Sequence, residues 1–170
     1  GNLMPQGAIQ FIDVTDRQAV TDLIRMNGLV DVVIPRGSAR LIQAVVQNAT
    51  VPVIETGAGV CHTCVDESAD CDMARRIAFN AKVQRPSVCN AMETLLVHEK
   101  VADAFLPQML KDYFSAGVTI FGCEQTQKFD SRIQAATEED WATEYGDLRL
   151  SVKIVRDLDE ALAHIARYST

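Results

Sequence analysis

Cys89 is the residue whose type and setting point most directly to chemistry. It follows Pro86 at a break in a helical pattern, so its thiol is predicted to lie on a loop. A thiolate is a strong nucleophile, and Lys82 and Arg85 are near enough in sequence to favour it by their positive charge. The alternative is a small buried hydrophobe, because most free cysteines are buried and inert. The residues around Cys89 leave both interpretations open.

A second group of candidates is Cys61 and Cys64 with His62 between them, a spacing found in zinc and redox sites. The same residues have the pattern of a strand, in which alternate side chains point to opposite faces of a sheet. Cys61 and Cys64 would then lie on opposite faces and could not chelate one ion. Packing within a sheet is therefore favoured and no metal site is predicted. A zinc or redox binding module is the rival hypothesis of a different class.

Two further candidates follow predicted strands. Gly37 and Ser38 form a turn that opens a helix, and the backbone N–H groups at a helix N-terminus can bind phosphate. A plain structural turn is an equal alternative. Glu55 ends a strand, where a carboxylate can act as a base with a raised pKa or can be solvated. The residues do not separate these alternatives.

Alternating strands and helices are predicted to position the candidates. Strand-like runs occupy residues 8–14, 30–35, 51–54, 60–65, 94–97, 118–121 and 148–155. Helical patterns occupy residues 15–27, 41–46, 70–83, 101–116 and 157–168. Residues 122–147 are polar, with a candidate short helix beginning at residue 137. The βαβαβ order of the early segments predicts an α/β fold with a parallel sheet.

The composition is that of an ordinary globular protein. The chain has 170 residues, of which 48% are hydrophobic and 23% charged, which excludes disordered and collagen-like classes. A net charge of -7 argues against nucleic acid and anionic membranes as partners. No apolar run is long enough for a transmembrane helix. The five cysteines are an odd number, which indicates reduced thiols in a cytoplasmic protein.

Three segments together resemble one enzyme family: residues 31–38 (DVVIPRGS), residues 60–66 (VCHTCVD) and above all residues 80–98 (NAKVQRPSVCNAMETLLVH). The family is that of the γ-glutamyl phosphate reductases, within the aldehyde dehydrogenase superfamily, and the resemblance covers nearly the whole chain. It implies an aldehyde dehydrogenase-like α/β fold. Residues 1–82 would form the C-terminal half of a Rossmann-type NADP-binding lobe, and residues 83–170 part of an α/β catalytic lobe.

The resemblance also implies an activity. The family reduces L-glutamyl 5-phosphate with NADPH to L-glutamate 5-semialdehyde and phosphate, in proline biosynthesis. Cys89 matches the family nucleophile, which forms a thioester that is then reduced. Gly37 and Ser38 match a turn near the cofactor pyrophosphate, and Glu144 matches a glutamate near the nicotinamide-side ribose.

Other expectations concern the surroundings of the nucleophile. Arg85, by charge and proximity, and Asn90 are predicted to contact substrate or phosphate. Glu55 aligns with the general base of hydrolytic aldehyde dehydrogenases, although phosphate release needs no water-activating base. The alternative enzyme is another acyl-thioester-forming dehydrogenase, such as a CoA-acylating one. Because family members are much longer, we expect this chain to be an internal fragment, inactive alone, of an enzyme that binds a small-molecule substrate and forms homo-oligomers.

Overall fold

The computed structural model describes residues 4–5, 7–55, 57 and 59–170, and the chain forms two compact units. The first unit is Gly1–Gly57 and the second is Ala58–Thr170. The lobe boundary predicted after residue 82 therefore differs from the boundary between the units. The reason is that residues 61–83 supply an edge strand and a helix to the sheet of the second unit.

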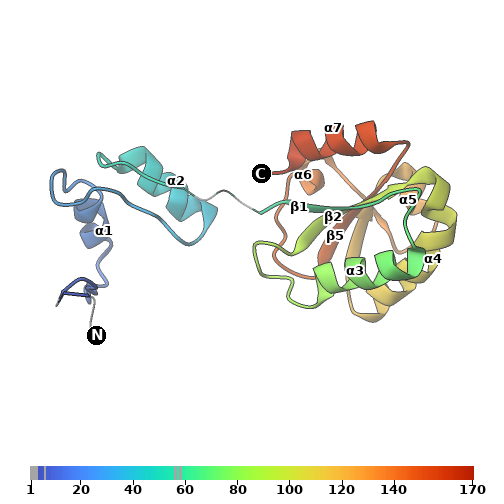
Figure 1. Ribbon diagram of the computed structural model, residues 1–170, viewed down its shortest axis with the longest axis horizontal. Helices are drawn as coiled ribbons and strands as arrows, with labels where there is room; N and C mark the ends of the chain where they lie inside the picture. The colour runs from blue at the N-terminus through green and yellow to red at the C-terminus, as the bar shows by residue number, and fades with distance from the viewer. Residues whose placement is uncertain (1–3, 6, 56, 58) are drawn as a thin grey trace. The chain divides into compact units, whose positions relative to one another are not determined.

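The second unit is built on a sheet of five parallel strands (Figure 1). Across the sheet the strands are β1 (Cys61–Val65), β2 (Met92–His98), β5 (Arg149–Val155), β3 (Thr119–Gly122) and β4 (Gln134–Ala135). Each neighbouring pair is parallel. The α/β class with a parallel sheet is thereby confirmed.

Helices cover both faces of this sheet. Helices α3 (Cys71–Val83) and α4 (Glu99–Ser115) lie on one face, and α7 (Leu158–Tyr168) lies on the other (Figure 1). Two short helices, α5 (Glu124–Gln127) and α6 (Glu138–Trp141), lie within the polar stretch of residues 122–147. The candidate helix start at residue 137 corresponds to α6, which Thr137 caps.

Strand β2 is the centre of the core, since all seven of its residues are buried. Parallel strands covered on both faces are usually apolar throughout. Glu93 is therefore an unusual member of β2, and it is only 1% exposed. A buried carboxylate of this kind requires a partner.

The first unit contains two helices, α1 (Arg17–Leu23) and α2 (Ala39–Asn48). The strands predicted over residues 8–14, 30–35 and 51–54 are wrong as sheet strands: the described residues of these segments form a single parallel bridge, between Val33 and Val53. Their β-forming residues lack the several paired neighbours and the buried face that make a sheet stable.

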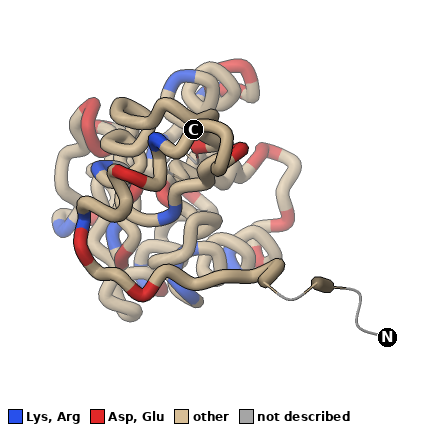
Figure 2. The backbone as a smooth tube through the Cα atoms, turned by 90° about the vertical axis from the view of Figure 1, so that its left-hand side faces the viewer, with Lys and Arg blue, Asp and Glu red and all other residues tan. Residues whose placement is uncertain are grey.

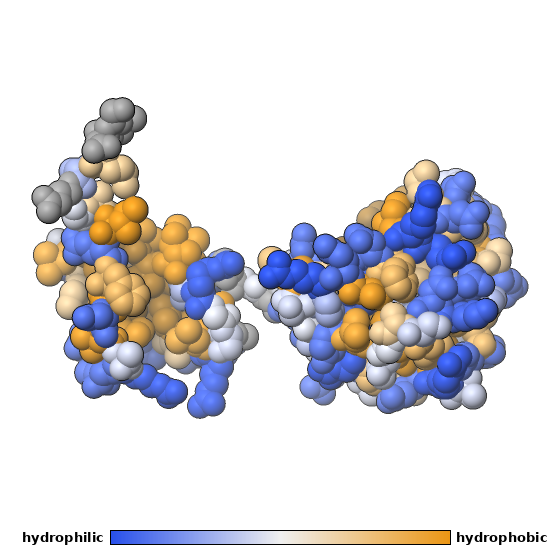
Figure 3. All heavy atoms as spheres, turned by 90° about the horizontal axis from the view of Figure 1, so that it is seen from below, coloured by the Kyte–Doolittle hydropathy of each residue, from blue (hydrophilic) through white to orange (hydrophobic). Residues whose placement is uncertain are grey.

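Large apolar side chains are exposed on the first unit. Phe11 is 90% exposed, Ile9 84% and Leu29 83%. The space-filling view of this unit, on the left of Figure 3, shows the hydrophobic residues gathered on one face. Contiguous apolar surface of this kind usually marks a place where a protein contacts more protein.

Two observations concern membranes and nucleic acids as partners. Within the described part of the chain, every helix is too short or too polar to traverse a bilayer. Positions of acidic and of basic residues are interspersed along the backbone drawn in Figure 2.

A cluster of aromatic rings joins α7 to the edge strand β1. The His164 ring lies 5.4 Å from His62, 5.3 Å from Trp141 and 4.6 Å from Tyr168, measured between centroids. His164 is 4% exposed, and burial lowers its pKa to about 4, with Lys153 and His62 adding to the effect. The folded protein therefore holds His164 neutral at pH values where an unfolded histidine is protonated.

This cluster predicts a loss of stability in mild acid. Because the His164 pKa is lower when folded than its usual value of 6.5, protons bind preferentially to the unfolded chain as the pH falls below 6.5. Between pH 7 and pH 5 we expect the free energy of unfolding to fall by about 2 kcal/mol more in the parent than in His164→Gln. Urea unfolding at the two pH values measures this difference. Equal falls in the two proteins would contradict it.

Candidate active site

Cys89 lies on the turn that leads from α3 into β2, outside either element. The turn is held by two backbone hydrogen bonds: Val88 N–H donates to the Arg85 carbonyl at 3.4 Å, and Ala91 N–H to the Val88 carbonyl at 2.9 Å. The Cys89 side chain is exposed. A thiol on a fixed turn with an open approach suits a nucleophile better than a packing residue.

The backbone of Cys89 meets two other segments at Gly59. A Cβ atom on Gly59 would overlap the Cys89 carbonyl oxygen and would lie 3.3 Å from Oε1 of Glu144. Glycine is therefore required here by space, because a larger residue would displace the turn. Cys89 and Glu144, predicted from sequence as nucleophile and cofactor contact, thus approach the same point.

Cys61 also faces this turn. Its Sγ donates a hydrogen bond to the Cys89 carbonyl oxygen at 3.4 Å. Burial raises the pKa of the Cys61 thiol, and the neighbouring Cys89, Glu93 and Glu144 raise it further. The Cys61 thiol therefore stays protonated and serves as a donor to the backbone of Cys89.

The other residues of the CxxC segment point elsewhere. His62 Nδ1 lies 3.0 Å from the Val60 carbonyl oxygen, and its ring packs on His164. Cys64 is exposed. Among the residues that the structure describes, no three His, Cys, Asp or Glu side chains are grouped as metal ligands would be.

A buried ion pair lies at the base of the Cys89 turn. Lys82 Nζ is 2.6 Å from Glu93 Oε2, and the two side chains are 0% and 1% exposed. The other oxygen, Glu93 Oε1, accepts from Gly146 N–H at 3.1 Å. Burial raises the pKa of Glu93, and the bond from Lys82 opposes that shift. Lys82 was expected to favour the Cys89 thiolate, but its charge is instead neutralised by Glu93.

The remaining predicted residues fall into two groups. Arg85 and Asn90 are exposed on the Cys89 turn. Gly37, Ser38 and Glu55 belong to the first unit and are exposed there.

The Gly37–Ser38 turn has the features of a phosphate cradle. Ser38 caps α2 by accepting from Leu41 N–H at 3.4 Å, and Gly37 adopts a φ of 145°, which favours glycine. A hollow of about 660 Å³ in the first unit is lined by Ser38 together with Arg17 and Arg40. Two arginines beside a helix N-terminus suit an anionic group.

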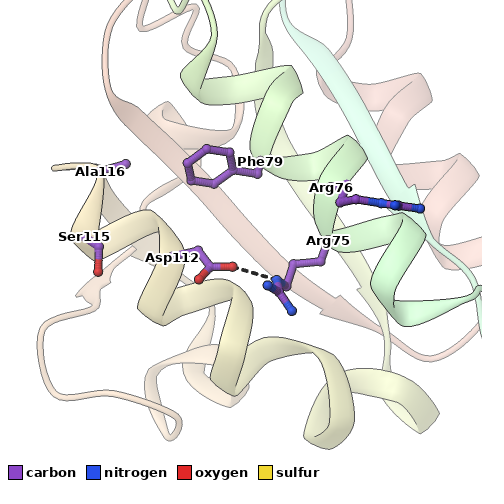
Figure 4. Close-up of a pocket in the computed structure, with 6 residues that line it drawn as sticks. All are labelled: Arg75, Arg76, Phe79, Asp112, Ser115 and Ala116. Carbon is purple, nitrogen blue, oxygen red and sulfur yellow. Dashed lines mark ion pairs between the residues drawn. The ribbon is translucent and has the colours of Figure 1, made fainter.

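A separate hollow of about 490 Å³ lies between α3 and α4 in the second unit (Figure 4). Its most prominent polar contact is the ion pair between Arg75 Nε and Asp112 Oδ2, at 2.7 Å. The residues that line it include none of the candidates for chemistry. This hollow therefore has no part in the candidate site.

Sequence reasoning missed Gly59, Cys61 and the Lys82–Glu93 pair as parts of the Cys89 surroundings. The sequence contains one indication of the Lys82–Glu93 ion pair. A single carboxylate in the apolar run of residues 91–97 indicates a buried charge, which must find a cation close by. The crowding at Gly59 had no comparable signal, because it arises between segments distant in sequence.

The crowding at Gly59 predicts the effect of one methyl group. In Gly59→Ala the Cys89 turn must move, so we expect a loss of about 1–3 kcal/mol in unfolding free energy and faster hydrogen exchange in residues 86–91. Gly117→Ala is the matched control, because Gly117 has a φ of 80° but no neighbour within 4 Å of its added Cβ. It should lose stability without altering exchange in the turn. Equal exchange in the two variants would refute the crowding argument.

Comparisons with known proteins show which family this chain belongs to. The model of the aldehyde dehydrogenase family matches residues 3–141. A gamma-glutamyl phosphate reductase of Caldanaerobacter subterraneus is 58% identical over 167 residues, which are 98% of this chain and 40% of that protein. A protein of the same name from Moorella thermoacetica is 61% identical over 166 residues, with the same coverage. The chain thus spans about 40% of the length of these curated relatives.

Solved structures agree with the sequence comparisons. The crystal structure of gamma-glutamyl phosphate reductase from Thermotoga maritima has a TM-score of 0.89 and 49% identity, over 95% of this chain and 39% of that one. An acetylating aldehyde dehydrogenase from Geobacillus thermoglucosidasius shares the fold, with a TM-score of 0.69 and 18% identity over 97% of this chain and 44% of that one. Since the family model matches well over half of the residues, the chain belongs to the aldehyde dehydrogenase family.

Proposed function

We propose that this chain is the nucleophile-bearing part of an NADPH-dependent reductase that converts L-glutamyl 5-phosphate to L-glutamate 5-semialdehyde and phosphate in proline biosynthesis. The observation that carries the proposal is the exposed Cys89 on a backbone fixed against Gly59, with the Glu144 carboxylate at the same point. High identity to proteins named gamma-glutamyl phosphate reductase supports the choice of substrate. In this proposal the first unit contributes to the cofactor lobe and the second to the catalytic lobe of a cytoplasmic, homo-oligomeric enzyme.

The chemistry begins at Cys89. Its thiolate attacks the acyl carbon of the substrate, the bond from that carbon to the phosphate oxygen breaks, and phosphate leaves with the electron pair. The product of this step is a thioester on Cys89, a far better hydride acceptor than a carboxylate. The Cys89 backbone N–H would stabilise the oxyanion that develops during attack. Arg85 and Asn90 would hold the phosphate or the substrate carboxylate from the same turn.

Each unit holds residues that we propose for binding the nicotinamide cofactor. Enzymes of this family use NAD or NADP, and the choice of NADPH is part of the proposal. Gly37 and Ser38 would hold the pyrophosphate at the N-terminus of α2, with Arg17 and Arg40 lining the same hollow. Glu144 would contact the nicotinamide-side ribose. When bound, the cofactor supplies the hydride that reduces the thioester.

Glu55 has no step in this reaction. The first half of the cycle releases phosphate rather than using water, so no general base is needed to activate a water molecule. Glu55 is exposed in the first unit. We therefore propose that its substitution leaves phosphate-dependent turnover largely intact.

The decisive test of the proposal is Cys89→Ser. We expect it to reduce turnover by about 10³-fold or more, since an alkoxide is not available near neutral pH as a thiolate is. The assay is phosphate-dependent oxidation of glutamate 5-semialdehyde in a full-length frame, made by placing this chain over the matching segment of the Caldanaerobacter relative. The exposed Cys64→Ser is the matched control and should retain turnover.

Three results would count against the proposal. Near-parental turnover in Cys89→Ser would remove the nucleophile assignment. Oxidation that depends on coenzyme A rather than on phosphate would instead favour the CoA-acylating alternative. Zinc bound in stoichiometric amount, and lost on substitution of Cys61 and Cys64, would favour a metal-binding module.

A further inference from the structure

The turn that carries Cys89 is closed at its base by one buried ion pair. Lys82 stands in the last turn of α3, and Glu93 is the second residue of β2. Residues 83–92 run between them and include Cys89. The contact is 2.6 Å long and shielded from water at 0% and 1% exposure, so its two ends are held at a fixed separation. Losing either partner would leave an uncompensated buried charge, which is strongly destabilising.

The same carboxylate holds a second segment. Its free oxygen, Glu93 Oε1, accepts from Gly146 N–H at 3.1 Å. Gly146 has a φ of 64°, which favours glycine, and it follows Glu144 by two residues. The nearby Glu144 carboxylate adds to the burial that raises the pKa of Glu93. The segment that presents Glu144 is thereby tied to the base of the Cys89 turn.

We propose that Glu93, paired with Lys82, is a positioning residue for the reaction at Cys89. Its Oε2 closes the nucleophile's turn, and its Oε1 fixes the segment that brings Glu144 to the same point beside Gly59. The inference rests on the proposed function, because it takes Cys89 as the nucleophile. Displacement of reacting groups by about 1 Å can cost about 100-fold in rate, so such a tether has a direct catalytic consequence.

Two double variants separate the effect of the hydrogen bond between Gly146 N–H and Glu93 from the effect of the buried charges of Lys82 and Glu93. Lys82→Met with Glu93→Met removes both charges and the acceptor for Gly146 N–H. Lys82→Met with Glu93→Gln also removes both charges but keeps an oxygen that can accept from Gly146 N–H. Replacing a whole buried pair by residues of similar volume is often neutral for stability, so both variants are expected to fold.

A matched control removes a different ion pair from α3. Arg75→Met with Asp112→Met breaks the 2.7 Å contact between α3 and α4, which lies in the hollow of Figure 4 and not beside the Cys89 turn. Its turnover should equal that of the parent. Glu93→Asp is a further variant that keeps the negative charge, but its shorter side chain cannot reach both partners at once.

Two measurements are compared. In the full-length frame, kcat should fall about tenfold or more in the Met/Met variant and recover in part in the Met/Gln variant, which keeps the acceptor for Gly146 N–H but not the contact with Lys82. The KM for the aldehyde should stay within about threefold of the parent. In this chain alone, amide exchange at Gly146 should be about tenfold faster in the Met/Met than in the Met/Gln variant. Glu93→Asp should lower kcat in the same way, and it serves as the test if the Met/Met variant does not fold.

Parental kcat in a folded Met/Met variant overturns the inference, and so does equal Gly146 exchange in the two double variants. If the proposed function itself is wrong, a different result is expected: the full-length frame without any substitution is inactive with glutamate 5-semialdehyde and phosphate. The exchange comparison does not depend on turnover. In that case it still decides whether Glu93 joins the two segments.

Discussion

Burial of β2 on both faces is the constraint on which the second unit depends. Strands β1 and β5 pair with its two edges, while α3 and α4 cover one face of the sheet and α7 the other. A carboxylate in such a strand cannot be solvated and must be neutralised inside the protein. Glu93 finds Lys82, and that pairing sets the path of the chain between α3 and β2. The exposed thiol of Cys89 is placed by a contact that is itself hidden from water.

The neighbours of Cys89 act on its backbone and leave its side chain free. Gly59 approaches the carbonyl group so closely that a methyl group would not fit, and the Cys61 thiol donates to the same oxygen. An exposed reactive group on an immobile backbone reconciles two needs of nucleophilic catalysis, which are access for the substrate and a defined direction of attack. Glu144 reaches the same point from the segment before β5, so one small region joins three distant parts of the sequence.

The sequence was a good guide to local elements of the second unit. The helix predicted over residues 70–83 is α3, Cys71–Val83, because a capping aspartate and an apolar stripe are local signals. The loop position of Cys89 followed in the same way from the proline after the helix. The partner of Lys82 did not follow, since an ion pair between a helix and a strand depends on how the two pack.

Long-range pairing also explains the failures in the first unit. Residues 30–35 have the residues of a buried strand, yet they contribute a single bridge to residues 51–54. A β-forming segment becomes a strand only when neighbours satisfy its hydrogen bonds and cover its faces. The apolar side chains left exposed on this unit, such as Phe11 and Leu29, fit a chain that spans about 40% of the length of its relatives.

The location of the acyl group in the reacting enzyme tests the role of Cys89 most directly. Freshly prepared L-glutamyl 5-phosphate, added to the full-length frame without cofactor, should leave a glutamyl group on one residue, with release of one equivalent of phosphate. Peptide mass spectrometry after an acid quench identifies that residue. We expect a thioester on Cys89, whose neighbours hold its backbone and leave its thiol exposed. An acyl group on any other residue, or phosphate release with no covalent adduct, would contradict it.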